Sequence, residues 1–150
     1  MKPVVPVAAA VALVGAFAAV VHAQSPDRQI KYRQAIMTAQ GYHFYGVLGG
    51  MAKGSRPYDK EAAVRSAKFV NELIEMPWDG FTPGSDTGAK TAAKPEIWKD
   101  RAEFDRLGKE AKVETEKLAA AAGVDLATLR AQVQATGRAC KNCHDKFQNE

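Results

Sequence analysis

Apolar side chains recur at helical spacing in four stretches of the chain, and glycines and prolines separate these stretches. The first stretch opens at Ser25-Pro26-Asp27, where a capping residue precedes a proline, and we expect a helix from there to about Lys53, just before Gly54. Its inward-facing positions repeat every seven residues, which is typical of a helix packed in a bundle. They are Ile30, Met37, Phe44 and Met51.

The other three stretches also predict helices. The second lies between Pro57 and Pro77, the third runs from about Pro95 to Ala122, and the fourth runs from about Asp125 to the C-terminus. A loop over residues 77–94, rich in glycine, proline and threonine, joins the second helix to the third. Four amphipathic helices with few β-branched runs predict an all-α fold, an antiparallel four-helix bundle over residues 24–150.

The N-terminus predicts an export signal. The run from Val4 to Val21 is uncharged, Lys2 precedes it, and Val21-His22-Ala23 places small side chains where a signal peptidase reads them. We therefore expect a signal peptide at residues 1–23 and a mature protein in the periplasm of a Gram-negative bacterium. An uncleaved membrane anchor is the alternative, because about 18 apolar residues can just span a bilayer.

The charge balance argues against a nucleic-acid partner. The chain has 21 basic and 17 acidic side chains, a formal net charge of +4, and they are spread along the sequence rather than gathered in one segment. No nucleophile is paired with an evident base, and His43 has no evident partner. We therefore expect a binding or electron-transfer protein and not an enzyme.

The most informative motif is Cys140-Lys141-Asn142-Cys143-His144. On a helix the two cysteines lie one turn apart on the same face, with His144 beside them. Two thiols at this spacing can add to the two vinyl groups of one haem, while the imidazole reaches the iron. This pattern is typical of c-type haem attachment and predicts one covalently bound haem c per chain.

Three other chemistries of a Cys-x-x-Cys pair fit less well. A thioredoxin-like motif would open a helix within a βαβ unit, and no strand pattern is visible. A zinc site needs three or four ligands, and the mature chain has no further cysteine. A disulfide across three residues of a helix would be strained.

A second iron ligand would have to come from upstream, because only six residues follow His144. The candidates are Met37, Met51, Met76 and His43. Met37 lies on the inward face of the first helix, whereas His43 is about 240° further round and should face away from it. Met37 is therefore either an apolar core residue or the distal ligand.

Taken together, these features resemble a class II c-type cytochrome, the cytochrome c prime family with its low-spin relatives of the cytochrome c-556 type. The likeness covers essentially residues 24–150, and cytochrome c prime is itself a four-helix bundle. Besides the haem motif, its markers are Lys31-Tyr32-Arg33-Gln34, Met76-Pro77-Trp78 with Phe81, and Lys94-Pro95-Glu96-Ile97-Trp98.

The resemblance implies roles for several further residues. Arg33 and Gln34 match a polar pair that approaches the haem propionates, and Thr91 matches a loop position near the haem edge. Trp78 and Phe81 match aromatics that pack against the macrocycle, and Met37 falls where members place a bulky distal residue, leucine or methionine. Many members have arginine or lysine four residues after the haem histidine, but this chain has Gln148.

Two functions follow from this resemblance. In the first, which we prefer, His144 is the only protein ligand to iron, and a crowded distal pocket near Met37 admits nitric oxide or carbon monoxide. In the second, the Met37 thioether completes a low-spin site that only transfers electrons. Both imply redox partner proteins in the periplasm. The family also implies a homodimer through the first two helices, where Tyr32, Tyr42 and Tyr45 could contribute to the interface.

Overall fold

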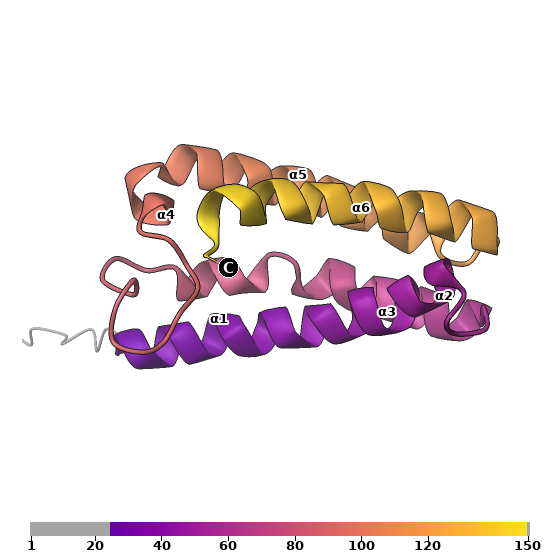
Figure 1. Ribbon diagram of the computed structural model, residues 1–150, viewed down its shortest axis with the longest axis horizontal. Coiled ribbons are helices and arrows are strands. Elements are labelled where there is room, and N and C mark those ends of the chain that lie inside the picture. The colour runs from indigo at the N-terminus through magenta and orange to yellow at the C-terminus, as the bar shows by residue number, and fades with distance from the viewer. Residues whose placement is uncertain (1–24, 150) are drawn as a thin grey trace, which may run out of the picture.

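The computed structural model describes residues 25–149, and it confirms the all-α four-helix bundle. Two antiparallel helix pairs pack on each other, α1 with α3 and α5 with α6 (Figure 1). In chain order the elements are α1 (Pro26–Gly41), a π-helix η1 (Tyr42–Leu48), α2 (Gly49–Lys53), α3 (Lys60–Leu73), a 3₁₀ helix η2 (Met76–Gly80), α4 (Glu96–Lys99), α5 (Arg101–Ala121) and α6 (Leu126–Phe147).

The first predicted helix is helical as far as Lys53 and ends at Gly54, whose φ of 83° terminates it in the left-handed conformation. It is not a uniform α-helix, because η1 interrupts it with wider π turns, a feature common at functional sites. Ile30, Phe44 and Met51 are buried as predicted. Met37 is 37% exposed, because it borders a cavity described below.

Two predicted helix boundaries are wrong. The third helix is split at Asp100, whose backbone leaves the helical region at φ −122° and ψ 57°, and whose side chain caps α5 by accepting a hydrogen bond from the Glu103 amide. The fourth helix stops at Phe147 instead of continuing to the C-terminus. Gln148 is extended there and forms an isolated antiparallel bridge with Ala93 of the long loop.

Two groups of buried side chains form the core. One joins η1 and α2 to α3, α5 and α6, and it includes Phe44, Met51 and Val70. The other joins the long loop to α5 and the end of α6, and it includes Phe81, Phe104 and Phe147. Side chains of both groups line the same cavity, so the cavity lies between them.

No helix within residues 25–149 is long and apolar enough to cross a membrane. The predicted signal peptide, residues 1–23, lies outside the described residues.

Candidate haem site

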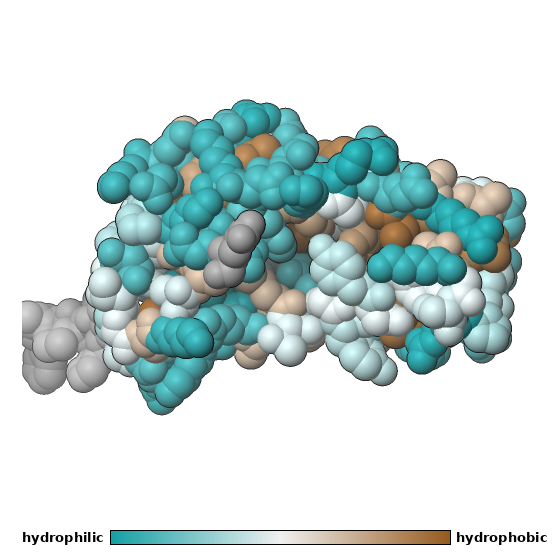
Figure 2. All heavy atoms as spheres, viewed as in Figure 1, coloured by the Kyte–Doolittle hydropathy of each residue, from teal (hydrophilic) through white to brown (hydrophobic). Residues whose placement is uncertain are grey.

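A cavity of about 600 Å³ opens between the two helix pairs, a size typical of cofactor sites. In Figure 2 hydrophobic side chains, coloured brown, lie in the recess between the two helix pairs. Most of the cavity lining is apolar, and it comes from α1, α3, α5, α6 and the long loop. Among the lining residues are Met37, Phe44, Val70, Trp78, Phe81, Ile97, Phe104, Cys140, Cys143, His144 and Phe147.

The haem motif forms one wall. Cys140, Cys143 and His144 all line the cavity from α6, and the two half-buried cysteines are free thiols. Burial raises the pKa of Cys140. Burial, and then the charge of the neighbouring Cys140, raise the pKa of Cys143 to about 11. Burial lowers the pKa of His144, so its imidazole favours the neutral form that binds metals.

Helix α1 and the following η1 form another wall. Met37, Gln40 and Gly41 line the cavity from α1, and Phe44 lines it from η1. His43 turns away as predicted, with its Nδ1 3.3 Å from Ser66 Oγ and its ring against Phe69.

Of the four upstream candidates for an iron ligand, Met37 alone borders the cavity. Met51 is buried in the core and Met76 is exposed on the surface, and neither lines the cavity. No group of three or more His, Cys, Asp or Glu that could hold a metal ion occurs in residues 25–149.

Arg33 is buried at one end of the cavity and anchors the long loop. Its Nη1 donates to the Gly80 carbonyl at 2.7 Å and to Ser85 Oγ at 3.0 Å, and its Nη2 donates to the Ser85 carbonyl at 2.9 Å and to Thr91 Oγ1 at 3.1 Å. The guanidinium also lies over the Phe81 ring, 4.5 Å from its centroid. The sequence pointed to Arg33 but not to this anchoring role.

All four of these hydrogen-bond acceptors are uncharged, so the buried Arg33 cation is bonded to no carboxylate. Burial lowers its pKa, and Asp86 opposes that shift only at a distance. Gln34 lies beside it and donates to the Lys90 carbonyl at 3.0 Å. The structure therefore brings Arg33, Gln34 and Thr91 together in the lining of one cavity.

The aromatic wall holds both predicted aromatics. Trp78 stacks on Phe104 with ring centroids 5.0 Å apart, and its Nε1 donates to Asp105 Oδ1 at 3.2 Å. Phe81 packs edge-on against Phe104 at 4.9 Å. Trp78 lies so close to α5 that only a glycine fits at position 108, a cavity-lining residue that the sequence analysis missed. The sequence feature that could have indicated this close packing is a glycine in the middle of a predicted helix, where glycine is otherwise unfavourable.

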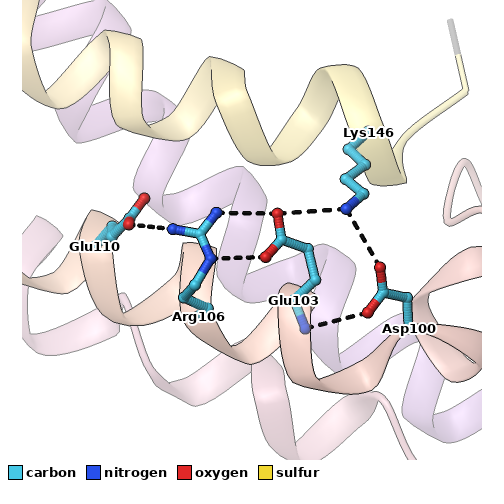
Figure 3. A network of polar contacts seen from close by, with 5 residues as sticks. All are labelled: Asp100, Glu103, Arg106, Glu110 and Lys146. Carbon is cyan, nitrogen blue, oxygen red and sulfur yellow. Dashed lines mark hydrogen bonds and ion pairs between the residues drawn. The ribbon is translucent and has the colours of Figure 1, made fainter.

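Lys146 is held away from the cavity by an ion-pair network. Its Nζ lies 3.2 Å from Asp100 Oδ2 and 3.3 Å from Glu103 Oε1, and Glu103 in turn binds Arg106 (Figure 3). The network ties the end of α6, which carries the haem motif, to the start of α5. Gln148, by contrast, lines the cavity.

Comparison with known proteins gives a consistent picture. The cytochrome c prime family model matches residues 28–148. Cytochrome c prime of Rubrivivax gelatinosus is 39% identical over 128 residues, which cover 85% of this chain and 98% of the relative. Its crystal structure superimposes with a TM-score of 0.79 over 84% of this chain and 98% of that one. Cytochrome c-554 of Cereibacter sphaeroides is 33% identical over all of this chain and 99% of the relative.

A further solved structure is the nitric oxide complex of a leucine-to-alanine variant of cytochrome c prime from Alcaligenes xylosoxidans. It is 35% identical, with a TM-score of 0.77 over 85% of this chain and 98% of that one. The fold and the cavity define a bundle cytochrome of the class II type. The chain belongs to the cytochrome c prime family and, as in that family, carries one covalently bound haem c.

Proposed function

We propose that this protein is a periplasmic haem c protein that binds nitric oxide or carbon monoxide at an iron held by His144. The observation that carries the proposal is the single cavity in which Cys140, Cys143 and His144 face an apolar wall containing Met37 and Phe44. An apolar, crowded wall opposite a lone imidazole suits small uncharged ligands. Nitric oxide complexes of two variants of the related Alcaligenes protein support the choice.

The two thiols are suited to holding the cofactor permanently. Each S–H would add across one vinyl C=C, forming one C–S bond and one C–H bond, so no atom is lost and no oxidant is consumed. Burial raises the pKa of both thiols, which favours their protonated form. When bound, the haem supplies the iron at which the gas is held.

Arg33, Gln34 and Thr91 would receive the propionates. The Nη1 and Nη2 groups of Arg33 donate to uncharged acceptors of the loop, and no carboxylate is hydrogen-bonded to the cation. A haem carboxylate would supply the missing charge, and an arginine suits it. Trp78 and Phe81 would pack against the macrocycle, because both line the cavity as part of one aromatic cluster.

Electron transfer through a low-spin His144/Met37 site is the second candidate. It is favoured by the position of Met37, the one methionine of residues 25–149 that borders the cavity. A thioether ligand would raise the reduction potential and close the position that a gas needs.

Absorption spectra of the purified protein, oxidised and dithionite-reduced, before and after addition of carbon monoxide, separate the two candidates. We expect a broad reduced band that sharpens and shifts with carbon monoxide. Met37→Leu is the matched variant, since it keeps the volume and removes the sulfur, and its reduced spectrum should equal that of the wild type. The opposite result would establish Met37 as a ligand. In that case the reduced wild type would show sharp bands that carbon monoxide does not change, and Met37→Leu would show the broad band.

Export and association complete the proposal. Cleavage after Ala23 would release the bundle into the periplasm, where redox proteins would exchange electrons with the haem. Mass spectrometry of the exported protein should show Gln24 as the first residue.

A homodimer would use the face of α1, η1 and α3 where Tyr42 is 65% and Phe69 39% exposed. Light scattering should give twice the monomer mass, and Tyr42→Lys should halve it.

A further inference from the structure

One polar atom in the cavity wall has no partner. Gln40 Nε2 is buried and makes no hydrogen bond, and no other buried side-chain nitrogen or oxygen within residues 25–149 is left in this state. A carboxamide has two N–H donors, and burying them unpaired is costly enough that native proteins rarely do it. We therefore expect Gln40 Nε2 to donate a hydrogen bond to an acceptor that is not part of the chain.

The residues around Gln40 supply no such acceptor. Met37 and Phe44, its neighbours on the same face of the helix, are apolar, as are Val70 and Ile74 of α3, which line the same cavity. The Thr38 and Thr91 hydroxyls also line the cavity, but neither accepts a hydrogen bond from Gln40 Nε2. What remains is the occupant of the cavity.

The position of Gln40 along α1 indicates which part of the occupant it meets. Arg33, at the propionate end, is seven residues earlier, about 10 Å along the helix axis. Phe44 is four residues later, and its ring lies 3.8 Å from where a Cβ on Gly137 would stand, one turn before Cys140. Gln40 therefore lies between the carboxylate end and the thioether end, on the helix that faces His144.

We propose that the Gln40 carboxamide donates a hydrogen bond to the diatomic ligand held opposite His144, and so determines which ligands the pocket retains. This inference rests on the proposed gas-binding function. A distal donor favours ligands whose outer atom carries negative charge, so Gln40 should strengthen binding of nitric oxide more than that of carbon monoxide. Met37 and Phe44, its apolar neighbours, supply bulk only.

The test compares wild type, Gln40→Leu and Gln134→Leu as reduced holoprotein. Gln134 is an exposed glutamine on α6 outside the cavity, so its replacement makes the same chemical change without touching the pocket. In Gln40→Leu the C–O stretching frequency of the carbon monoxide adduct should rise, because a hydrogen bond to the outer oxygen weakens the C–O bond. Nitric oxide should dissociate roughly 2- to 13-fold faster, the factor that one hydrogen bond of ordinary net strength supplies. Gln134→Leu should match the wild type in both measurements.

The outcomes distinguish failure of the role proposed for Gln40 from failure of the proposed gas-binding function. An adduct that forms in Gln40→Leu with an unchanged C–O stretch and an unchanged dissociation rate overturns the role of Gln40 and leaves gas binding intact. Failure of the wild type to form any adduct overturns both. Thermal unfolding of the same three proteins without added gas supplies a readout independent of ligand. Removal of an unpaired donor should raise the melting temperature of Gln40→Leu above that of the wild type, whereas loss of a protein-internal hydrogen bond would lower it.

Discussion

Replacing Gly108 by alanine tests the packing of Trp78, on which the aromatic wall of the haem cavity depends. A Cβ at position 108 would lie 2.8 Å from Trp78 Cε2 and closer still to Cζ2, so the ring would have to move. Its stack on Phe104 and its hydrogen bond to Asp105 both resist that movement. Overpacking of this kind costs about 1–3 kcal/mol, while the better helix propensity of alanine returns about 1 kcal/mol.

We therefore expect Gly108→Ala to destabilise the protein by up to about 2 kcal/mol, the difference between these two effects. Gly137→Ala is the matched control, because it makes the same change inside α6, where the new methyl would meet only the Phe44 ring at 3.8 Å. It should stabilise the protein by about 0.5–1 kcal/mol.

Guanidinium unfolding of the holoproteins, followed by far-UV circular dichroism, measures both free energies of unfolding. Near-UV circular dichroism should change in Gly108→Ala alone, since only that variant displaces a tryptophan. If both alanine variants were stabilised equally, Trp78 would not lie against α5, and the aromatic wall described above would be wrong.

Three further predictions concern the haem motif, the buried arginine and the ion-pair network. Cys140→Ser/Cys143→Ser should lose covalent haem, seen as loss of haem staining on a denaturing gel, together with much of its helical signal. Arg33→Lys, which keeps the charge but cannot reproduce the four hydrogen bonds, should be destabilised by about 2–4 kcal/mol and should expose the long loop to proteolysis. Hydrogen bonds from Arg106 and Lys146 lower the pKa of Glu103 from 4.5 to about 2. Glu103 should therefore stabilise the fold above pH 4.5 and lose this effect as the pH falls towards 2, so the stability difference between wild type and Glu103→Gln should vanish there.

Periodicity was enough to predict the four helices, because each buries one apolar stripe. It could not predict the break at Asp100, since the residues on either side of it carry helical patterns of their own. The break is stabilised from a distance, as Arg101 Nη1 donates to the Phe81 carbonyl at 2.9 Å, 20 residues away in sequence. The π turns of η1 are equally invisible to a pattern that assumes 3.6 residues per turn.

Some residues of the site could likewise be predicted from the sequence, and others could not. Cys140, Cys143 and His144 could be predicted because their chemistry depends on spacing within one helical turn. The partners of Arg33 lie 47 to 58 residues away, so only the folded chain shows that the cation anchors a loop. Gln40 carried no sequence signal at all, because a glutamine on a helix is ordinary until its surroundings are seen to be apolar.

The two ends of the cavity differ in a way that matches the two edges of a haem. Helix α6 runs antiparallel to α1, so the thiol of Cys140 lies near Tyr45, whose pKa is raised by burial and then by that cysteine. Arg33 stands more than about 12 Å earlier along the helix axis, counting the eight α-helical steps from Arg33 to Gly41 at 1.5 Å each. A haem joined to the protein by its vinyl edge near Tyr45 would have its carboxylates towards Arg33, which is hydrogen-bonded to no carboxylate. The reversed orientation would leave that cation buried without an anion and would bring two carboxylates into the apolar group around Phe44. Covalent attachment and electrostatics would thus favour the same orientation.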